Sequence, residues 1–135
     1  ELKDKITEVI LAAPDIDADV FRRDIAPKMV QKIAKPITLY VSADDLALIA
    51  SRKVHGSPRA GDAGKGVVIV DGVETIDASG VDTSFLSHSY FATTSTIIAD
   101  ILDLIKSGKR AADRETLEKV SRENVTYWKV KQGKN

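Results

Sequence analysis

The sequence has 135 residues, 20 of them basic and 20 acidic, and it contains no cysteine. The length suits a single domain, and 43% hydrophobic with 30% charged residues is typical of a globular rather than a disordered chain. A formal net charge of zero gives no electrostatic reason to expect nucleic acid or an anionic membrane surface as partner. The lack of cysteine excludes disulfides, a thiol nucleophile and thiolate metal sites.

The start of the chain indicates a piece of a longer protein. It begins with Glu1 and reaches a strand-like run almost at once, so we expect a cut inside a larger chain, with any targeting segment upstream. An apolar run of transmembrane length does not occur in the sequence, and we expect no membrane segment. The compartment, cytoplasmic or exported, is not determined by these residues.

Strands and helices alternate in the first part of the chain. Residues 8–13 form a strand-like run in which, after Glu8, both the even and the odd positions are apolar. This is the pattern of a strand that is covered on both faces of a parallel sheet. The helix that follows is expected to be capped by Asp17 or Asp19, and Pro27 either interrupts it or starts a second helix. Residues 37–41 are β-branched and aromatic and predict the next strand.

The middle of the chain repeats this order. The polar loop 42–45 opens a helix over about 46–54, and Gly56 follows it as the expected stop. Residues 67–76 carry Asp-Gly between two apolar runs, a pattern that predicts a hairpin with a tight turn. Its core strand is expected at 73–78.

The last strong helix is expected over 95–106, ended by Gly108. Its aliphatic residues are expected on one face, which would be core: Ile97, Ile98, Ile101, Leu102, Leu104 and Ile105. Its charged residues are expected on the other side: Asp100, Asp103 and Lys106. This pattern favours a core helix over a membrane helix.

The end of the chain is more polar. Residues 111–124 predict a polar helix, and residues 125–130 alternate weakly, so they either dock as an edge strand or remain mobile. We therefore divide the chain into a sheet-forming part, 1–110, and a polar helix with a tail, 111–135.

The order strand, helix, strand, helix, strand, helix predicts an α/β fold. Right-handed crossovers then give a three-layer αβα arrangement around a mostly parallel sheet. In such sheets ligands bind at the carboxyl ends of the strands. Three polar groups lie at these ends: Asp15 with Asp17, Asp44 with Asp45, and His88.

A carboxylate and a histidine at neighbouring strand ends suit acyl-transfer chemistry. A serine nucleophile needs an imidazole to accept its proton, and the imidazole needs a carboxylate that fixes its tautomer and stabilises its charged form. The acid of residue 44 or 45 precedes His88 in the chain, which is the order of the α/β-hydrolase triad.

Four stretches of the sequence resemble one known group as a set. They are residues 10–21 (ILAAPDIDADVF), 38–48 (TLYVSADDLAL), 73–79 (VETIDAS) and 87–91 (SHSYF). They resemble, in this order, the end of the sixth strand, the seventh strand with its acid turn, the eighth strand and the histidine loop of poorly characterised α/β-hydrolases. This group is often labelled esterase/lipase-like proteins of unknown function, and the resemblance covers about residues 8–106.

The resemblance implies the C-terminal part of an α/β-hydrolase fold from a serine hydrolase that cleaves a small-molecule ester or related acyl bond. It implies that Asp45 is the triad acid and His88 the base, without a metal or organic cofactor. Asp44 is the main rival for the acid, or it caps the following helix. The Gly-x-Ser-x-Gly elbow of the nucleophile does not occur in these residues, so we expect the chain alone to be inactive.

Weaker patterns favour ordinary structural roles. Asp15, Asp17 and Asp19 are spaced like the start of a calcium loop, but the sixth and twelfth loop positions lack the required Gly and Glu. His55 either helps to line a pocket, with Arg52, Arg59 and Asp62, or only ends its helix. Two distant histidines are too few for a confident zinc site.

Two further expectations remain open. The alternative to a hydrolase is a non-catalytic Rossmann-like binding or scaffold domain, in which Asp45 and His88 would lie far apart. The strand of residues 8–13 would also present a bare apolar sheet edge. We expect a homodimer through this edge, an exchanged element, or coverage of the edge by the chain's own tail.

Overall fold

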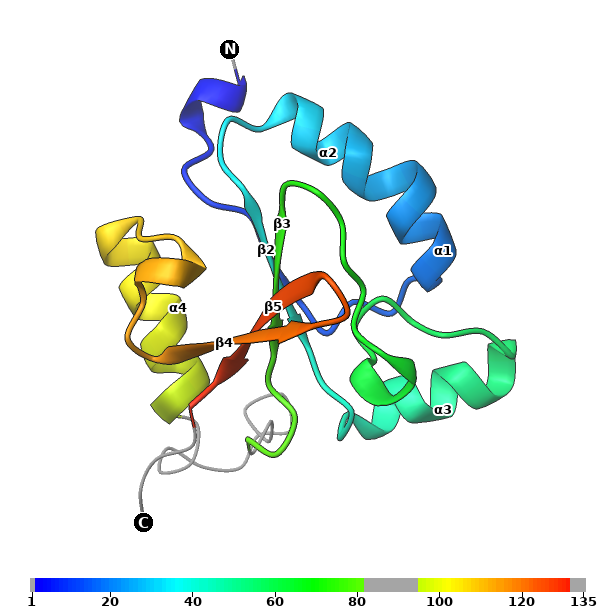
Figure 1. Ribbon diagram of the computed structural model, residues 1–135. Helices are drawn as coiled ribbons and strands as arrows, with labels where there is room; N and C mark the ends of the chain where they lie inside the picture. Colours follow the sequence, from blue (N-terminus) through cyan, green and yellow to red (C-terminus); the bar gives the residue numbers. More distant parts are fainter. Residues whose placement is uncertain (1, 82–94, 132–135) are drawn as a thin grey trace.

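The computed structural model describes residues 2–81 and 95–131. Its centre is a five-stranded sheet in the order β1-β2-β3-β5-β4 (Figure 1). The first four strands in this order run parallel, and β4 runs antiparallel to β5. The strands are β1 (Ile10–Ala12), β2 (Ile37–Val41), β3 (Val73–Asp77), β4 (Leu117–Arg122) and β5 (Val125–Val130).

Helices cover both faces of the sheet, so the predicted three-layer fold is confirmed. The segments α1 (Ala18–Val20), α2 (Ala26–Lys32) and α3 (Leu46–His55) lie on one side, and α4 (Ser95–Ser107) lies on the other (Figure 1). The shorter helical turns are η1 (Leu2–Lys5), the π-helical η2 (Phe21–Ile25), η3 (Ala63–Lys65) and η5 (Ala111–Asp113). No helix in the described part of the chain is long and apolar enough to cross a membrane.

Local sequence accounts for the helix ends. The Asp17 carboxylate accepts hydrogen bonds from the backbone of Asp19 and Val20, so Asp17 is the first cap. The π-turn η2 joins α1 to α2 without a break, and Pro27, which has no N–H to donate to the preceding turn, lies in the first turn of α2. Gly56 ends α3 with φ at 67°, a left-handed conformation that suits glycine.

The core has two halves, one on each face of the sheet. On the α4 face, Tyr40 and Ile76 pack with Ile97. On the opposite face, Leu39 and Val41 pack with Phe21. Neighbouring residues of β2 thus point to opposite halves, and all of β2 is buried, as expected of a central parallel strand.

The polar helix predicted for residues 111–124 is wrong. After the short turn η5 the chain forms the hairpin β4–β5, whose tight turn has φ at 48° for Glu123 and 66° for Asn124. Two consecutive positive φ values fit the primed turns of two-residue hairpins, but Glu-Asn is not the usual sequence for them. The 125–130 segment does form a strand. It lies inside the sheet between β3 and β4, because β4 takes the edge.

The hairpin predicted for residues 67–76 is also wrong. Strand β3 pairs in parallel with β2, whereas residues 67–70 form no strand. The buried side chain of Val68 packs into the core opposite α4, and its carbonyl accepts a hydrogen bond from Thr75 Oγ1 at 2.6 Å. The apolar run therefore reflects burial over the sheet and not strand pairing, and the Asp-Gly turn leads straight into β3.

The face prediction for α4 is only partly right. Ile97 and Leu104 are buried, but Ile98, Leu102 and Ile105 are 40%, 45% and 60% exposed. Asp100, which was expected on the solvent side, is fully buried. A charged side chain therefore takes a core position, and a partner of opposite charge is required there.

The two edges of the sheet are β1 and β4. The chain's final hairpin adds to the β3 side, far from β1 in the strand order. The described part of the tail, up to residue 131, therefore does not cover the edge of β1.

Candidate functional site at the carboxyl ends of the strands

The acidic turn after β2 carries both candidate triad acids. Asp45 is the N-cap of α3, and its Oδ1 accepts the Leu48 N–H at 3.0 Å. Asp44 is exposed and extends in another direction, where its Oδ2 accepts the Gly80 N–H at 2.6 Å. The capping role that was considered for Asp44 therefore belongs to Asp45, because its backbone is extended at the point where the helix begins.

The turns after β2 and β3 are tied together. The Ala43 N–H donates to Ser79 Oγ at 2.8 Å, and the Asp44 carboxylate binds the backbone of Gly80. The turn after β3 is closed by its own bond, from the Ser79 N–H to Asp77 Oδ1 at 2.8 Å. These contacts hold the acidic turn beside the start of the segment that leads toward residue 88.

His88 itself lies outside the described residues, so its distance from Asp45 is not part of the structure. The structure brings Asp44, Asp45 and the turn at residues 79–80 together. Asp15 and Asp17 lie at the end of β1, where they make other contacts.

A second polar cluster lies between the end of β1 and α3. Ser51 Oγ donates to Asp15 Oδ1 at 2.7 Å, and Arg59 Nε binds the same oxygen at 2.6 Å. These two hydrogen bonds, first that of Ser51 and then that of Arg59, lower the pKa of the Asp15 carboxyl. His55 Nδ1 lies 2.9 Å from the carbonyl oxygen of Ser51, to which it donates, since a carbonyl can only accept.

This cluster contains a serine, a histidine and an aspartate in the wrong order for catalysis. In a triad the histidine stands between the serine and the acid, and it accepts the serine proton. Here the Ser51 hydroxyl donates to Asp15. Ser51 Oγ also lies 3.2 Å from His55 Nδ1, but this nitrogen carries a proton that it donates to the Ser51 carbonyl, so it cannot accept the proton of the hydroxyl. The arrangement therefore ties α3 to the end of β1 and does not activate Ser51.

The loop after α3 is held by ion pairs of its own. Arg52 binds the buried carboxylate of Asp62, whose other oxygen accepts the Gly64 N–H at 2.8 Å. Gly61 packs so closely on Ala13 that an added Cβ would lie 2.4 Å from the Ala13 carbonyl carbon. The residues that were considered around His55 are thus paired within the fold. No group of three or more metal-ligating side chains suited to an ion is found among the described residues.

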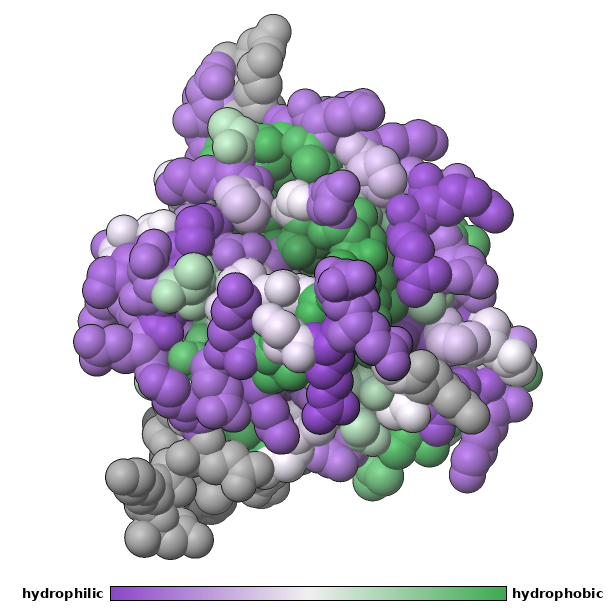
Figure 2. Space-filling view, viewed as in Figure 1, coloured by the Kyte–Doolittle hydropathy of each residue, from purple (hydrophilic) through white to green (hydrophobic). Residues whose placement is uncertain are grey.

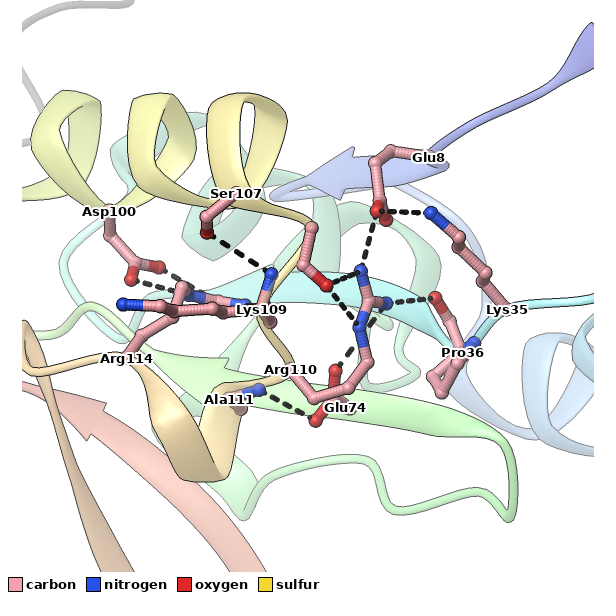
Figure 3. Close-up of polar contacts among 11 residues, drawn as sticks. Glu8, Lys35, Pro36, Glu74, Asp100, Ser107, Lys109, Arg110, Ala111 and Arg114 are labelled. Atoms are coloured by element: carbon pink, nitrogen blue, oxygen red, sulfur yellow. Dashed lines mark hydrogen bonds and ion pairs between the residues drawn. The ribbon is translucent and has the colours of Figure 1, made fainter.

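A buried charge network on the α4 face was not predicted from the sequence. Arg114 donates to both oxygens of Asp100, at 2.7 and 3.1 Å, and both side chains are fully buried (Figure 3). Tyr40 and Thr116 also donate to Asp100, each at 2.5 Å. Burial and then the bond to Asp100 raise the pKa of Tyr40 far above its ordinary value.

A second network joins the N-terminal ends of the strands to the end of α4. Arg110 donates to Glu8 at 2.5 Å and to the Pro36 carbonyl at 3.2 Å, and it lies 3.8 Å from Glu74 (Figure 3). Lys35 approaches Glu8 at 3.5 Å. Both networks lie away from the acidic turn after β2, and their contacts suit a structural role.

The fold defines the class of the chain: a mostly parallel α/β sheet with polar turns at the carboxyl ends of its strands. The chain belongs to a family described as α/β hydrolases of unknown function (DUF900), which matches residues 1–107. No curated protein and no solved structure matches the chain. The match ends before η5 and the hairpin β4–β5.

Proposed function

We propose that the chain supplies the acid and the histidine of a Ser-His-Asp triad in a serine hydrolase that acts on a small-molecule ester or related acyl bond. Asp45 is the proposed acid and His88 the proposed base. The serine and the oxyanion hole would come from residues outside this chain, because the 135 residues contain no Gly-x-Ser-x-Gly elbow. The chain alone would then be inactive.

One observation carries the proposal. The acidic turn after β2 is hydrogen-bonded to the turn after β3, from which the chain continues toward His88. Asp45 uses Oδ1 for the helix cap, and among the described residues its Oδ2 accepts no hydrogen bond. That oxygen suits the role of accepting an imidazole N–H, while the cap keeps the carboxylate in a fixed orientation.

The chemistry follows from these roles. His88 would take the proton of the serine hydroxyl as its oxygen attacks the ester carbonyl, and it would return that proton to the leaving alcohol as the tetrahedral intermediate collapses. Water would then attack the acyl-enzyme with His88 again as base. Asp45 would hold the imidazole tautomer and stabilise its charged form throughout.

The histidine is tested in a protein that contains this chain together with a Gly-x-Ser-x-Gly serine. His88→Ala should lower kcat/KM for p-nitrophenyl acetate by about 10³–10⁴-fold. The matched control is His55→Ala, which should leave the rate within about twofold, because His55 donates to a backbone carbonyl. An unchanged rate in His88→Ala would remove the triad and favour a scaffold role.

The acid is tested by comparing two neighbouring variants. Asp45→Asn should reduce kcat/KM by about 10³–10⁴-fold, and Asp44→Asn by less than about tenfold. Asparagine keeps an oxygen for the α3 cap, so folding should be little affected. The opposite order of the two effects would assign the acid to Asp44, whose carboxylate binds Gly80.

In the described part of the chain no strand pairs with the outer edge of β1, which supports a homodimer as a separate proposal. Val9 O and Ala13 N bond to β2, so the backbone groups of Ile10 and Ala12 point to the free edge. Sedimentation velocity should show association that grows with concentration. Ala12→Lys should suppress it, because a lysine on an edge strand opposes pairing. A wild-type chain that stays monomeric at all concentrations would refute the dimer.

A further inference from the structure

The segment 58–63 connects the carboxyl ends of β1 and β2. It returns from the end of α3 toward the sheet (Figure 1). The Gly61 N–H donates to the Pro14 carbonyl at 2.9 Å, and the Gly61 carbonyl accepts the Ser42 N–H at 2.8 Å, so one residue spans both strand ends. The Ala63 N–H donates in turn to the Ser42 carbonyl at 3.3 Å. The segment thus holds both backbone groups of Ser42, the first residue of the acidic turn.

The acidic turn is therefore held from two sides. Segment 58–63 bonds Ser42 on the side of β1, and the Ser79 hydroxyl accepts the Ala43 N–H on the side of β3. Asp45 follows at the start of α3, and its carboxylate caps that helix. The direction of this carboxylate thus depends on how α3 lies relative to the end of β2.

An ion pair joins α3 to segment 58–63. Arg52 follows Asp45 by seven residues, which is about two helical turns, so the two lie on the same side of α3. The Arg52 guanidinium binds the carboxylate of Asp62, which follows Gly61 in the segment. The contacts therefore form a closed path, from the acidic turn along α3 to Arg52 and back through Asp62 to the end of β2.

The carboxylate of this pair is withdrawn from solvent. Hydrophilic side chains cover most of the face seen in Figure 2, where a charge costs little. The side chain of Asp62, in contrast, is only 1% exposed, and that of Arg52 is 22% exposed. A buried carboxylate needs partners, and here they are Arg52 and the Gly64 N–H, at 2.8 Å. Because both partners have fixed places, α3 has little freedom to shift against segment 58–63.

We propose that the Arg52–Asp62 pair positions the Asp45 carboxylate. This inference rests on the proposed role of Asp45 as the triad acid. With the pair intact, α3 and the end of β2 keep one relative position, and Asp45 Oδ2 keeps the direction in which it would accept an imidazole N–H. Without the pair α3 shifts, and Asp45 is still present but no longer orients the base. Neither Arg52 nor Asp62 takes part in the chemistry itself.

The effect is measured in a protein that contains this chain together with a Gly-x-Ser-x-Gly serine. Asp62→Asn keeps an oxygen for the Gly64 N–H but removes the charge that holds Arg52. It should lower kcat for p-nitrophenyl acetate by about 10- to 100-fold and leave KM within about twofold. The matched control Glu8→Gln removes a pair of similar exposure, with Arg110, at the opposite ends of the strands, and should change kcat by less than about twofold. Equal losses in both variants would overturn the proposal.

A double variant separates positioning from a general structural role. If Asp62 acts through Asp45, its charge matters only while Asp45 is an acid. Asp62→Asn in the Asp45→Asn background should therefore lower kcat by less than about a further twofold. A further loss as large as that in the wild-type background would show that Asp62 acts independently, and it would overturn the proposal.

The other partner gives a second test if Asp62→Asn does not fold, because Arg52 is the more exposed of the two. Arg52→Ala should lower kcat as much as Asp62→Asn. Arg52→Lys keeps a positive charge for the single oxygen that Arg52 binds and should lose clearly less. Equal losses in the two Arg52 variants, or an unchanged kcat in Arg52→Ala, would overturn the proposal. Circular dichroism confirms that each variant is folded.

Failure of this inference differs from failure of the proposed function. If His88→Ala removes the activity and Asp62→Asn does not, the triad stands and the positioning role is wrong. If neither variant changes the rate, the triad itself is wrong and the positioning role is wrong with it.

Discussion

The two faces of the sheet are closed by different interactions. On the face of α1, α2 and α3, apolar side chains such as Phe21 and Leu39 fill the core, and the ion pairs lie at its rim. On the α4 face, the fully buried pair Asp100–Arg114 lies beside the apolar cluster. A buried ion pair is rarely more stabilising than apolar packing, but it fixes one arrangement of the groups that it joins.

On the α4 face that arrangement includes the C-terminal hairpin. Asp100 belongs to α4, Tyr40 to β2, and Arg114 and Thr116 to the segment just before β4. One carboxylate therefore connects a helix, the central strand and the hairpin that extends the sheet. The opposite face is closed mainly by hydrophobic burial, with the ion pairs Arg52–Asp62 and Arg59–Asp15 at its rim, and it should respond differently to pH and to substitution.

The largest effect is expected from breaking the buried pair. Asp100→Ala leaves Arg114 without its partner and should lower the free energy of unfolding by about 3–5 kcal/mol, measured by urea denaturation. The matched control is the double variant Asp100→Leu with Arg114→Met, which removes both charges and should cost clearly less. Equal losses in both variants would show that the pair contributes no specific electrostatic coupling.

A slightly smaller effect is expected on the apolar face. Leu39 is fully buried, and Leu39→Ala should lower the free energy of unfolding by about 2–5 kcal/mol through lost burial and a cavity. This loss should be the same at pH 6 and pH 9, since no ionisable group is removed. A strongly pH-dependent loss would contradict the contrast between the two faces.

The hydroxyl of Tyr40 should contribute less to the free energy of unfolding than the Asp100–Arg114 pair or the side chain of Leu39. Tyr40→Phe removes one hydrogen bond to the charged Asp100 and should cost about 1.5–3 kcal/mol. The folded pKa of Tyr40 is raised above its unfolded value, so folding keeps the hydroxyl protonated. Its contribution is complete below the unfolded pKa of about 10 and is lost as the pH rises above it. Absorbance at 295 nm should show no ionisation of Tyr40 in the folded chain near pH 11.

The smallest effect is expected at the rim of the apolar face. The pKa of Asp15 is lowered in the fold by Ser51 and then by Arg59, so its contribution is present above the unfolded pKa. That contribution is lost as the pH falls below about 4, toward the folded pKa. Asp15→Asn should weaken this part of the acid dependence of the melting temperature, with Asp19→Asn as the control. An identical acid profile in Asp15→Asn and the wild type would contradict the role of this cluster.

The sequence predicted the elements whose signals are local. Three strands, their helices and the stops at Gly56 and Gly108 follow from periodicity, capping residues and left-handed glycines. The position of the acidic turn at a strand end was likewise predictable, because the strand 37–41 and the helix after it are both clear in the sequence. The relation of that turn to His88 remains a prediction from chain order and resemblance.

Tertiary contacts decided the rest. The local pattern of residues 111–124 predicted a helix. The segment instead forms the hairpin β4–β5, because β3 offers an edge with which β5 pairs and because Arg114 binds Asp100. Periodicity also could not place Asp100, since a carboxylate enters a core only when a distant partner, fourteen residues later in the chain, neutralises it. The sequence by itself determined the α/β class and the acidic strand end. Only the folded structure decided the sheet's final edge, the buried charges and the segment that connects the ends of β1 and β2, because each depends on contacts between residues far apart in the chain.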